Sequence, residues 1–77
     1  MKNDKNFTML CKKLGCNIKK KREQRQLTIK EMSNLTGIRT EYLRKIELGT
    51  AYGIMIETHL FKIAKAVNLK LSDLFDF

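Results

Sequence analysis

The sequence predicts an all-α fold, a compact five-helix bundle, and three observations support this prediction. The 77-residue chain contains no proline, so no residue of that kind interrupts a helix. Apolar residues recur at three- and four-residue steps along most of the chain, as they do on the buried face of a helix. Glycines directly follow two of the short periodic segments, where a helix is expected to end.

The first and longest predicted helix runs from about Phe7 to Arg25. Its apolar face is formed by Phe7, Leu10, Cys11, Leu14 and Ile18. The residues before it are polar, so we expect a flexible N-terminal segment over 1–6 and a single domain over 7–77. A chain of this length buries only about 60% of its unfolded surface, which fits one modest hydrophobic core.

The second predicted helix has the clearest start signal. Thr28 and Glu31 have the spacing of a capping box, in which each side chain accepts a backbone N–H of the other residue. The helix should end at Thr36, with Gly37 in the left-handed conformation after it. So short a helix is unstable alone in water. Two apolar side chains are expected to pack it onto its neighbours: Met32 and Leu35.

A third helix is expected from about Thr40 to Leu48, with Gly49 as its stop. Tyr42 or Leu43, together with Ile46, should point inward. The outer face is then polar and rich in hydrogen-bonding groups, with Arg39, Thr40, Glu41, Arg44 and Lys45.

The rest of the chain predicts a loop, a fourth helix and a short final helix. The loop covers 50–53, and the fourth helix covers about Ile56 to Val67 and is capped by Asn68. The final helical turn should begin at Ser72, whose hydroxyl could cap it. This tail is strongly apolar through Leu69, Leu71, Leu74 and Phe75.

The net charge of +8 is concentrated in the first part of the chain. Residues 1–30 hold ten lysines and arginines against two acidic residues, whereas residues 31–77 hold six of each sign. A one-sided positive field attracts polyanions, of which nucleic acid and an anionic membrane surface are the candidates. The membrane is the weaker candidate, because the apolar face of the first helix is needed for the core. No run of about 18 apolar residues is present and the N-terminus does not resemble a signal peptide, so we expect a cytoplasmic protein.

The residue types that carry metal or catalytic chemistry are sparse. Cys11 and Cys16 point about 140° apart on a helix, which disfavours a disulfide or a shared metal site. We expect Cys11 in the core and Cys16 on the surface. His59 has no partner at zinc-site spacing and is expected to be a surface or packing residue. Without a nucleophile beside an acid–base pair or a glycine-rich phosphate loop, we expect no metal, no cofactor and no enzymatic activity.

Two short helices joined by a tight turn at 37–39 form the helix-turn-helix pattern. In this arrangement the second helix enters the major groove of DNA, where each base pair presents a distinct set of donors and acceptors. Helical hairpins also occur in proteins that bind no DNA, so the pattern alone supports a DNA-binding function only in part.

Further residues at fixed spacing sharpen this prediction. They are Ile18-x-x-x-Arg22, then Leu27-Thr28-x-x-Glu31-Met32-Ser33-x-x-Thr36-Gly37-Ile38-x-x-x-Tyr42-Leu43-x-x-Ile46-Glu47-x-Gly49, then Leu60-Phe61-Lys62-Ile63-Ala64-Lys65-Ala66-Val67 and Ser72-Asp73-Leu74. With this pattern the chain resembles the lambda-repressor-like family of phage repressors and Cro proteins, over about residues 10 to 75.

The resemblance implies a bacterial or phage-encoded transcriptional regulator, with a repressor as the expected type. It implies that the third helix reads double-stranded DNA in the major groove, and the residues transferred by position are Arg39, Thr40, Glu41, Arg44 and Lys45. These side chains suit the task, because arginine and lysine pair with guanine, glutamate accepts from cytosine N4, and threonine contacts a base edge or a thymine methyl. Contacts to the DNA backbone are expected from Arg22, Thr28, Lys30 and Tyr52.

The resemblance also implies a structural ion pair between Arg22 and Glu47 beneath the third helix. Three departures from the family pattern affect the anchoring on DNA. The loop over 50–53 lacks the usual proline and any basic residue, which leaves the Tyr52 hydroxyl or backbone amides to contact phosphate. Ile29 stands where many members have a phosphate-binding glutamine, so backbone N–H groups and Lys30 must take its place. Arg39 replaces the usual serine or threonine cap, so the third helix is expected to start at Thr40.

One helix reads only a few base pairs, so we expect a homodimer on an inverted repeat. In the family the C-terminal helix often forms the dimer contact, and here the candidate side chains are Leu71, Leu74, Phe75 and Phe77. These residues could equally close a small core. An alternative function is that of an interaction module whose helix-turn-helix binds a protein partner, which Glu41 and the uncharged loop after the third helix would favour.

Overall fold

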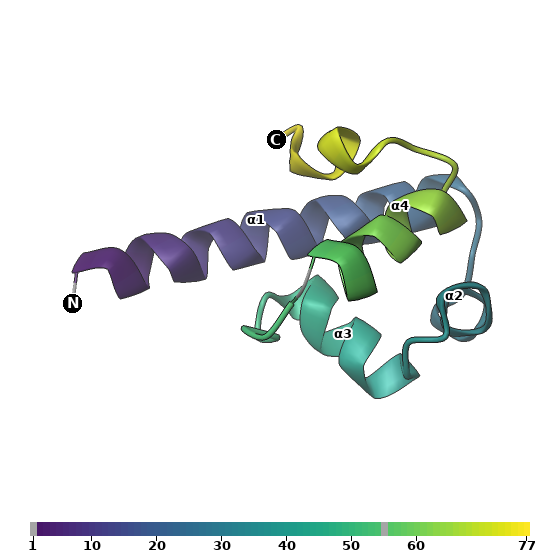
Figure 1. Cartoon of the computed structure of the whole chain (residues 1–77), viewed down its shortest axis with the longest axis horizontal. Coiled ribbons are helices and arrows are strands. Elements are labelled where there is room, and N and C mark those ends of the chain that lie inside the picture. Colours follow the sequence, from purple (N-terminus) through teal and green to yellow (C-terminus); the bar gives the residue numbers. More distant parts are fainter. Residues whose placement is uncertain (1, 55) are drawn as a thin grey trace.

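The chain folds into four α-helices and two short helical turns in the computed structural model, which describes residues 2–54 and 56–77. The long helix α1 lies along the longest axis, and the other elements pack around its C-terminal part, while its N-terminal part extends beyond them (Figure 1). In chain order the elements are α1 (Lys2–Gln24), α2 (Ile29–Thr36), α3 (Thr40–Leu48), the π-helical turn η1 (Ile56–Leu60), α4 (Phe61–Ala66) and the 3-10 turn η2 (Leu71–Phe75).

The all-α class is confirmed, but the expected count of five helices is wrong, since the described residues form four α-helices. The C-terminal segment is too short for a further α-helix and closes as the 3-10 turn η2. Its cap also differs from the expected one. The Asp73 carboxylate accepts from the Lys70 N–H at 2.9 Å, so this carboxylate fills the role predicted for the Ser72 hydroxyl.

The predicted bounds of α2 and α3 are confirmed. At the start of α2, the Thr28 hydroxyl accepts from the Glu31 N–H at 3.0 Å and the Glu31 carboxylate accepts from the Thr28 N–H at 2.8 Å. Gly37 and Gly49 end the two helices with φ angles of 76° and 79°. Both angles lie in the left-handed region that glycine adopts without steric cost.

Helix α1 begins at Lys2, before the expected start at Phe7. The expected apolar face is buried at Cys11, Leu14 and Ile18, but Leu10 is 45% exposed and Phe7 is 48% exposed. The Phe7 ring contacts that of Tyr52, with centroids 6.0 Å apart. The division into a flexible segment 1–6 and a domain 7–77 remains a prediction.

The fourth predicted helix, Ile56 to Val67, is present in two pieces, η1 followed by α4. Asn68 follows with a φ of 58°, which confirms it as the left-handed residue that ends this segment. One expected position is wrong: Leu35 is 60% exposed, and Thr36 is buried in its place on α2. Leu74 is fully buried, which agrees with the alternative that it closes the core.

A single hydrophobic core joins these elements beside α1. It consists of Leu14, Ile18, Met32, Ile38, Leu43, Ile46, Ala51, Leu60, Ile63, Ala64, Val67 and Leu74. One buried polar side chain crosses its edge: the Asn17 amide donates to the carbonyl oxygens of Asp73 and Leu74 at 3.2 and 2.8 Å. These bonds hold η2 against α1.

The cysteines lie as predicted, with Cys11 buried, Cys16 exposed and both thiols free. Burial raises the pKa of the Cys11 thiol. Among the described residues there is no group of histidine, cysteine and acidic side chains that could hold a metal ion. None of the described helices is both long and apolar enough to cross a membrane.

The backbones of α1 and α3 approach each other closely at Gly15. A Cβ at this position would overlap the Ile46 carbonyl oxygen and would lie 2.7 Å from the Glu47 carbonyl oxygen. Because these atoms are backbone, they cannot rotate away, and one helix would have to shift. Gly15 therefore sets how near α3 lies to α1.

We expect Gly15→Ala to lower the free energy of unfolding by about 3 kcal/mol or more, because the methyl group is forced against backbone. In a helix without that contact the same change would be stabilising by up to about 1 kcal/mol. Urea denaturation measures the difference. Gly53→Ala is the matched control, since its nearest neighbour would be the Tyr42 hydroxyl at 3.7 Å. Equal stability of the two variants would contradict the close approach.

For the cysteines we expect one fast and one slow reaction with a thiol-specific reagent at pH 8. Cys16 should react at once, whereas Cys11 should react only when the protein opens, because the reagent attacks an accessible thiolate. Mass spectrometry of the singly modified protein identifies the site. A Cys16→Ser variant that still shows a fast phase would contradict this assignment.

Candidate nucleic-acid interface

The turn between α2 and α3 is fixed by two hydroxyl groups of α2. The Ser33 hydroxyl donates to the Ile38 carbonyl oxygen at 2.5 Å. The Thr36 hydroxyl donates to the Met32 carbonyl oxygen at 2.8 Å and accepts from the Ile38 N–H at 3.1 Å. These bonds satisfy buried backbone groups at the turn, so the angle between the two helices is set locally. The sequence analysis assigned no such role to either hydroxyl.

Helix α3 buries one side and exposes the other. Leu43 and Ile46 are fully buried, as expected. Of the five predicted base-reading residues, four are exposed and Thr40 is half-buried: Arg39, Thr40, Glu41, Arg44 and Lys45. The structure therefore brings them together on the outer side of one helix. Arg39 precedes the helix without a side-chain cap, which confirms that α3 starts at Thr40.

A sixth side chain on this outer side, Leu48, was missed by the sequence analysis. At about 100° per residue, Glu41 and Leu48 point most directly away from the buried pair of α3, with Arg44 and Lys45 on either side of them. Leu48 is 69% exposed. Leu48 follows the outward-facing Lys45 by three residues, and this helical spacing could have predicted that it also points outward.

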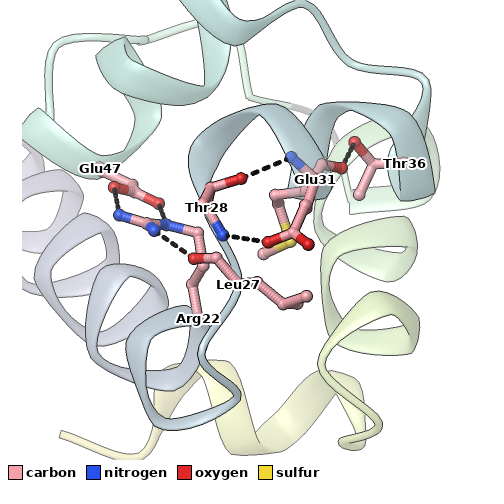
Figure 2. A network of polar contacts seen from close by, with 7 residues as sticks. Arg22, Leu27, Thr28, Glu31, Thr36 and Glu47 are labelled. Carbon is pink, nitrogen blue, oxygen red and sulfur yellow. Dashed lines mark hydrogen bonds and ion pairs between the residues drawn. The ribbon is translucent and has the colours of Figure 1, made fainter.

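The predicted ion pair between Arg22 and Glu47 is present (Figure 2). The Arg22 guanidinium donates through Nε and Nη2 to the two Glu47 carboxylate oxygens at 2.7 and 3.2 Å. Its Nη1 donates to the Leu27 carbonyl oxygen at 2.6 Å. The two side chains are only 12% and 7% exposed. The hydrogen bond to Glu47 raises the pKa of Arg22, so the charge is fixed.

These three bonds connect α1, the segment before α2, and α3. Because Arg22 is largely committed to them, only part of its guanidinium remains for a phosphate. Its contact with the DNA backbone stays a prediction. The same holds for Thr28, whose hydroxyl already caps α2, and for exposed Lys30 beside it.

A cleft of about 560 Å³ lies between α1, the start of α2 and α3. It is lined by Cys16, Lys19, Arg22, Ile29, Arg44, Glu47 and Leu48. Glu47 is neutralised by Arg22, so the exposed cations Lys19 and Arg44 give the cleft a positive rim. The sequence gives no sign that Lys19 of α1 lies near Arg44 of α3, and only the fold brings them to one cleft.

Tyr52 is exposed in the loop after α3 and lies against Phe7 of α1. It therefore sits at the opposite end of α3 from Arg39 (Figure 1). The ring of Tyr42 on α3 and the ring of His59 on η1 have centroids 4.9 Å apart, which confirms His59 as a packing residue.

A capped short helix, a glycine turn and a second helix with a charged outer side define a helix-turn-helix unit, the class of fold that binds DNA. Comparison with protein families agrees with this geometry, because residues 15–76 match a family model described as a helix-turn-helix domain. The match covers most of the chain, so the protein belongs to this helix-turn-helix family and is a DNA-binding protein. No curated protein and no solved structure matches the chain.

We expect Glu47→Ala to lower the free energy of unfolding by about 3–5 kcal/mol, because it leaves the Arg22 charge buried without its partner. Chemical denaturation followed by circular dichroism measures this loss. Glu57→Ala is the control, since it removes an exposed carboxylate and should change stability by less than about 0.5 kcal/mol. Similar losses in the two variants would show that the ion pair does not hold the helices together.

Proposed function

We propose that the protein is a sequence-specific transcriptional regulator that reads double-stranded DNA with α3 in the major groove. The observation that supports this most strongly is the outer side of α3. Long polar side chains are gathered there, while the helix is held from behind by the Arg22–Glu47 pair and its buried leucine and isoleucine. A rigid helix with free polar groups is what base readout requires.

In the proposed complex the five predicted residues of α3 contact base edges. Arg39, Arg44 and Lys45 are donors suited to guanine, and Glu41 is an acceptor suited to cytosine N4. Thr40 contacts a base edge or a thymine methyl group. The start of α2 approaches a phosphate, where its N–H groups and Lys30 bind the backbone in place of the glutamine common in related sequences. Arg22 and Tyr52 are the other proposed backbone contacts.

Regulation would follow from occupancy of the site. A domain of this size bound across a promoter excludes polymerase, so repression is the outcome we propose.

We also propose that the protein binds an inverted repeat as a homodimer through its C-terminal region. Leu74 is not part of this proposed contact, because it is fully buried in the protein's own core. Leu71 is half-buried, whereas Phe75 and Phe77 are 40% and 53% exposed. Phe75 and Phe77 therefore remain as the exposed apolar side chains of this region.

We expect selection from a random pool of duplexes to recover a short inverted repeat, with binding that weakens steeply as salt rises. Lys45→Ala should change the preferred base at one or two positions, at a cost of about 1–3 kcal/mol for the wild-type site. Lys30→Ala should weaken binding to all sequences alike. Lys65→Ala, which removes an exposed lysine of α4, controls for the loss of one positive charge.

Three outcomes would contradict the proposed readout. Equal affinity for the selected duplex and for a scrambled duplex of the same length would exclude sequence-specific binding. Identical effects of the Lys30 and Lys45 variants on base preference would exclude the division into backbone and base contacts. Failure to bind any duplex, with retention of a protein from the same cells, would favour the interaction module.

For the dimer, we expect the combined change Phe75→Ser and Phe77→Ser to shift the protein to monomer in sedimentation experiments and to abolish cooperative binding to the two half-sites. Leu35→Ser is the matched control, because this leucine is 60% exposed on α2 and lines a cleft with residues of α4 rather than with the C-terminal region. A double variant that still dimerises would exclude this surface as the dimer contact.

A further inference from the structure

Leu48 is the most exposed of the large apolar side chains in the described part of the chain, at 69%. An exposed leucine alone is ordinary on a protein surface. Its place in the fold is what requires an explanation. It ends the outer side of the helix proposed to face DNA, and the other outward side chains of that helix are polar.

The position of Leu48 relative to Glu41 fits a base-contacting residue. The two side chains share the outward line of α3 and are separated by about two helical turns, or about 10 Å along the axis. That length corresponds to about three base pairs at ~3.4 Å each. A helix lying in the groove with Glu41 on a base edge therefore brings Leu48 to base edges further along the same groove.

The charges around Leu48 indicate what covers it. It lines the cleft between α1, α2 and α3 together with Lys19 and Arg44, while the remaining charged pair there, Arg22 and Glu47, is mutually neutralised. An apolar protein surface docked over Leu48 would have to desolvate the two free cations. A nucleic-acid duplex offers phosphates to Lys19 and base-edge acceptors to Arg44, so a polyanion is the occupant that fits this surface.

We propose that Leu48 is a further specificity-determining residue that contacts the 5-methyl group of a thymine. This proposal rests on the proposed function, since it requires α3 in the major groove. The thymine methyl is the apolar group that DNA displays there, and contact with it excludes water from both partners. The contact selects thymine over cytosine, which has no methyl group at this position.

The test replaces each thymine of the selected operator, one at a time, with deoxyuridine, which pairs identically but lacks the methyl group. For the wild-type protein we expect one position in each half-site where this change weakens binding about fourfold, the effect of one methyl group removed from water. Leu48→Ala should bind the thymine operator more weakly and should bind thymine and deoxyuridine equally at that position. It should still discriminate at any thymine contacted by Thr40.

Leu35→Ala is the matched control, since it removes an equally bulky exposed leucine from α2 and should keep the full discrimination of the wild type. Thermal unfolding of both variants checks that the fold is retained. The proposal is overturned if the operator has no thymine in its half-site, if wild type is insensitive to every deoxyuridine, or if Leu48→Ala keeps the wild-type ratio. If the wild-type protein selects no operator from the pool of duplexes, that result refutes the proposed function itself.

Discussion

The bidentate pairing of Arg22 with Glu47 is the interaction on which the placement of α3 depends. It is largely shielded from water and joins the last turn of α1 to the last turn of α3, and a third bond reaches the Leu27 carbonyl just before α2. Desolvating two charges is costly, so such a pair adds little net stability compared with apolar residues. Its geometry is nevertheless directional, and it fixes three segments relative to one another (Figure 2).

A second constraint acts on the same helix from its other contacts. The absence of a side chain at Gly15 lets α3 rest directly against the backbone of α1, and the hydroxyls of Ser33 and Thr36 fix the turn that leads into α3. Backbone contact, hydrogen bonds and the ion pair thus restrain α3 along its whole length. These restraints fix the orientation of its outer side, and the side chains that face solvent contribute nothing to them.

Local signals in the sequence predicted much of this fold, and the errors arose where burial depends on distant segments. The capping box at Thr28 and the stops at Gly37 and Gly49 act within a few residues, so the bounds of α2 and α3 were correct. Periodicity placed Phe7 and Leu35 inward, but the segments that reach them cover only part of each side chain, and these side chains stay 48% and 60% exposed. The exposure of four of the five proposed base-reading residues was predictable from helical spacing. The proximity of Lys19 to Arg44 was not, because it requires the packing of α1 against α3.

The side chains on the outer side of α3 pack little against the core. This separation affects how the DNA preference of such a protein can change. Four of its five proposed reading residues and Leu48 are exposed, so replacing them alters the chemistry offered to DNA while changing folding stability by less than about 0.5 kcal/mol each. A gene copy could therefore drift from one operator to another through viable intermediates. The same independence makes this helix a natural place to graft new DNA preferences by design.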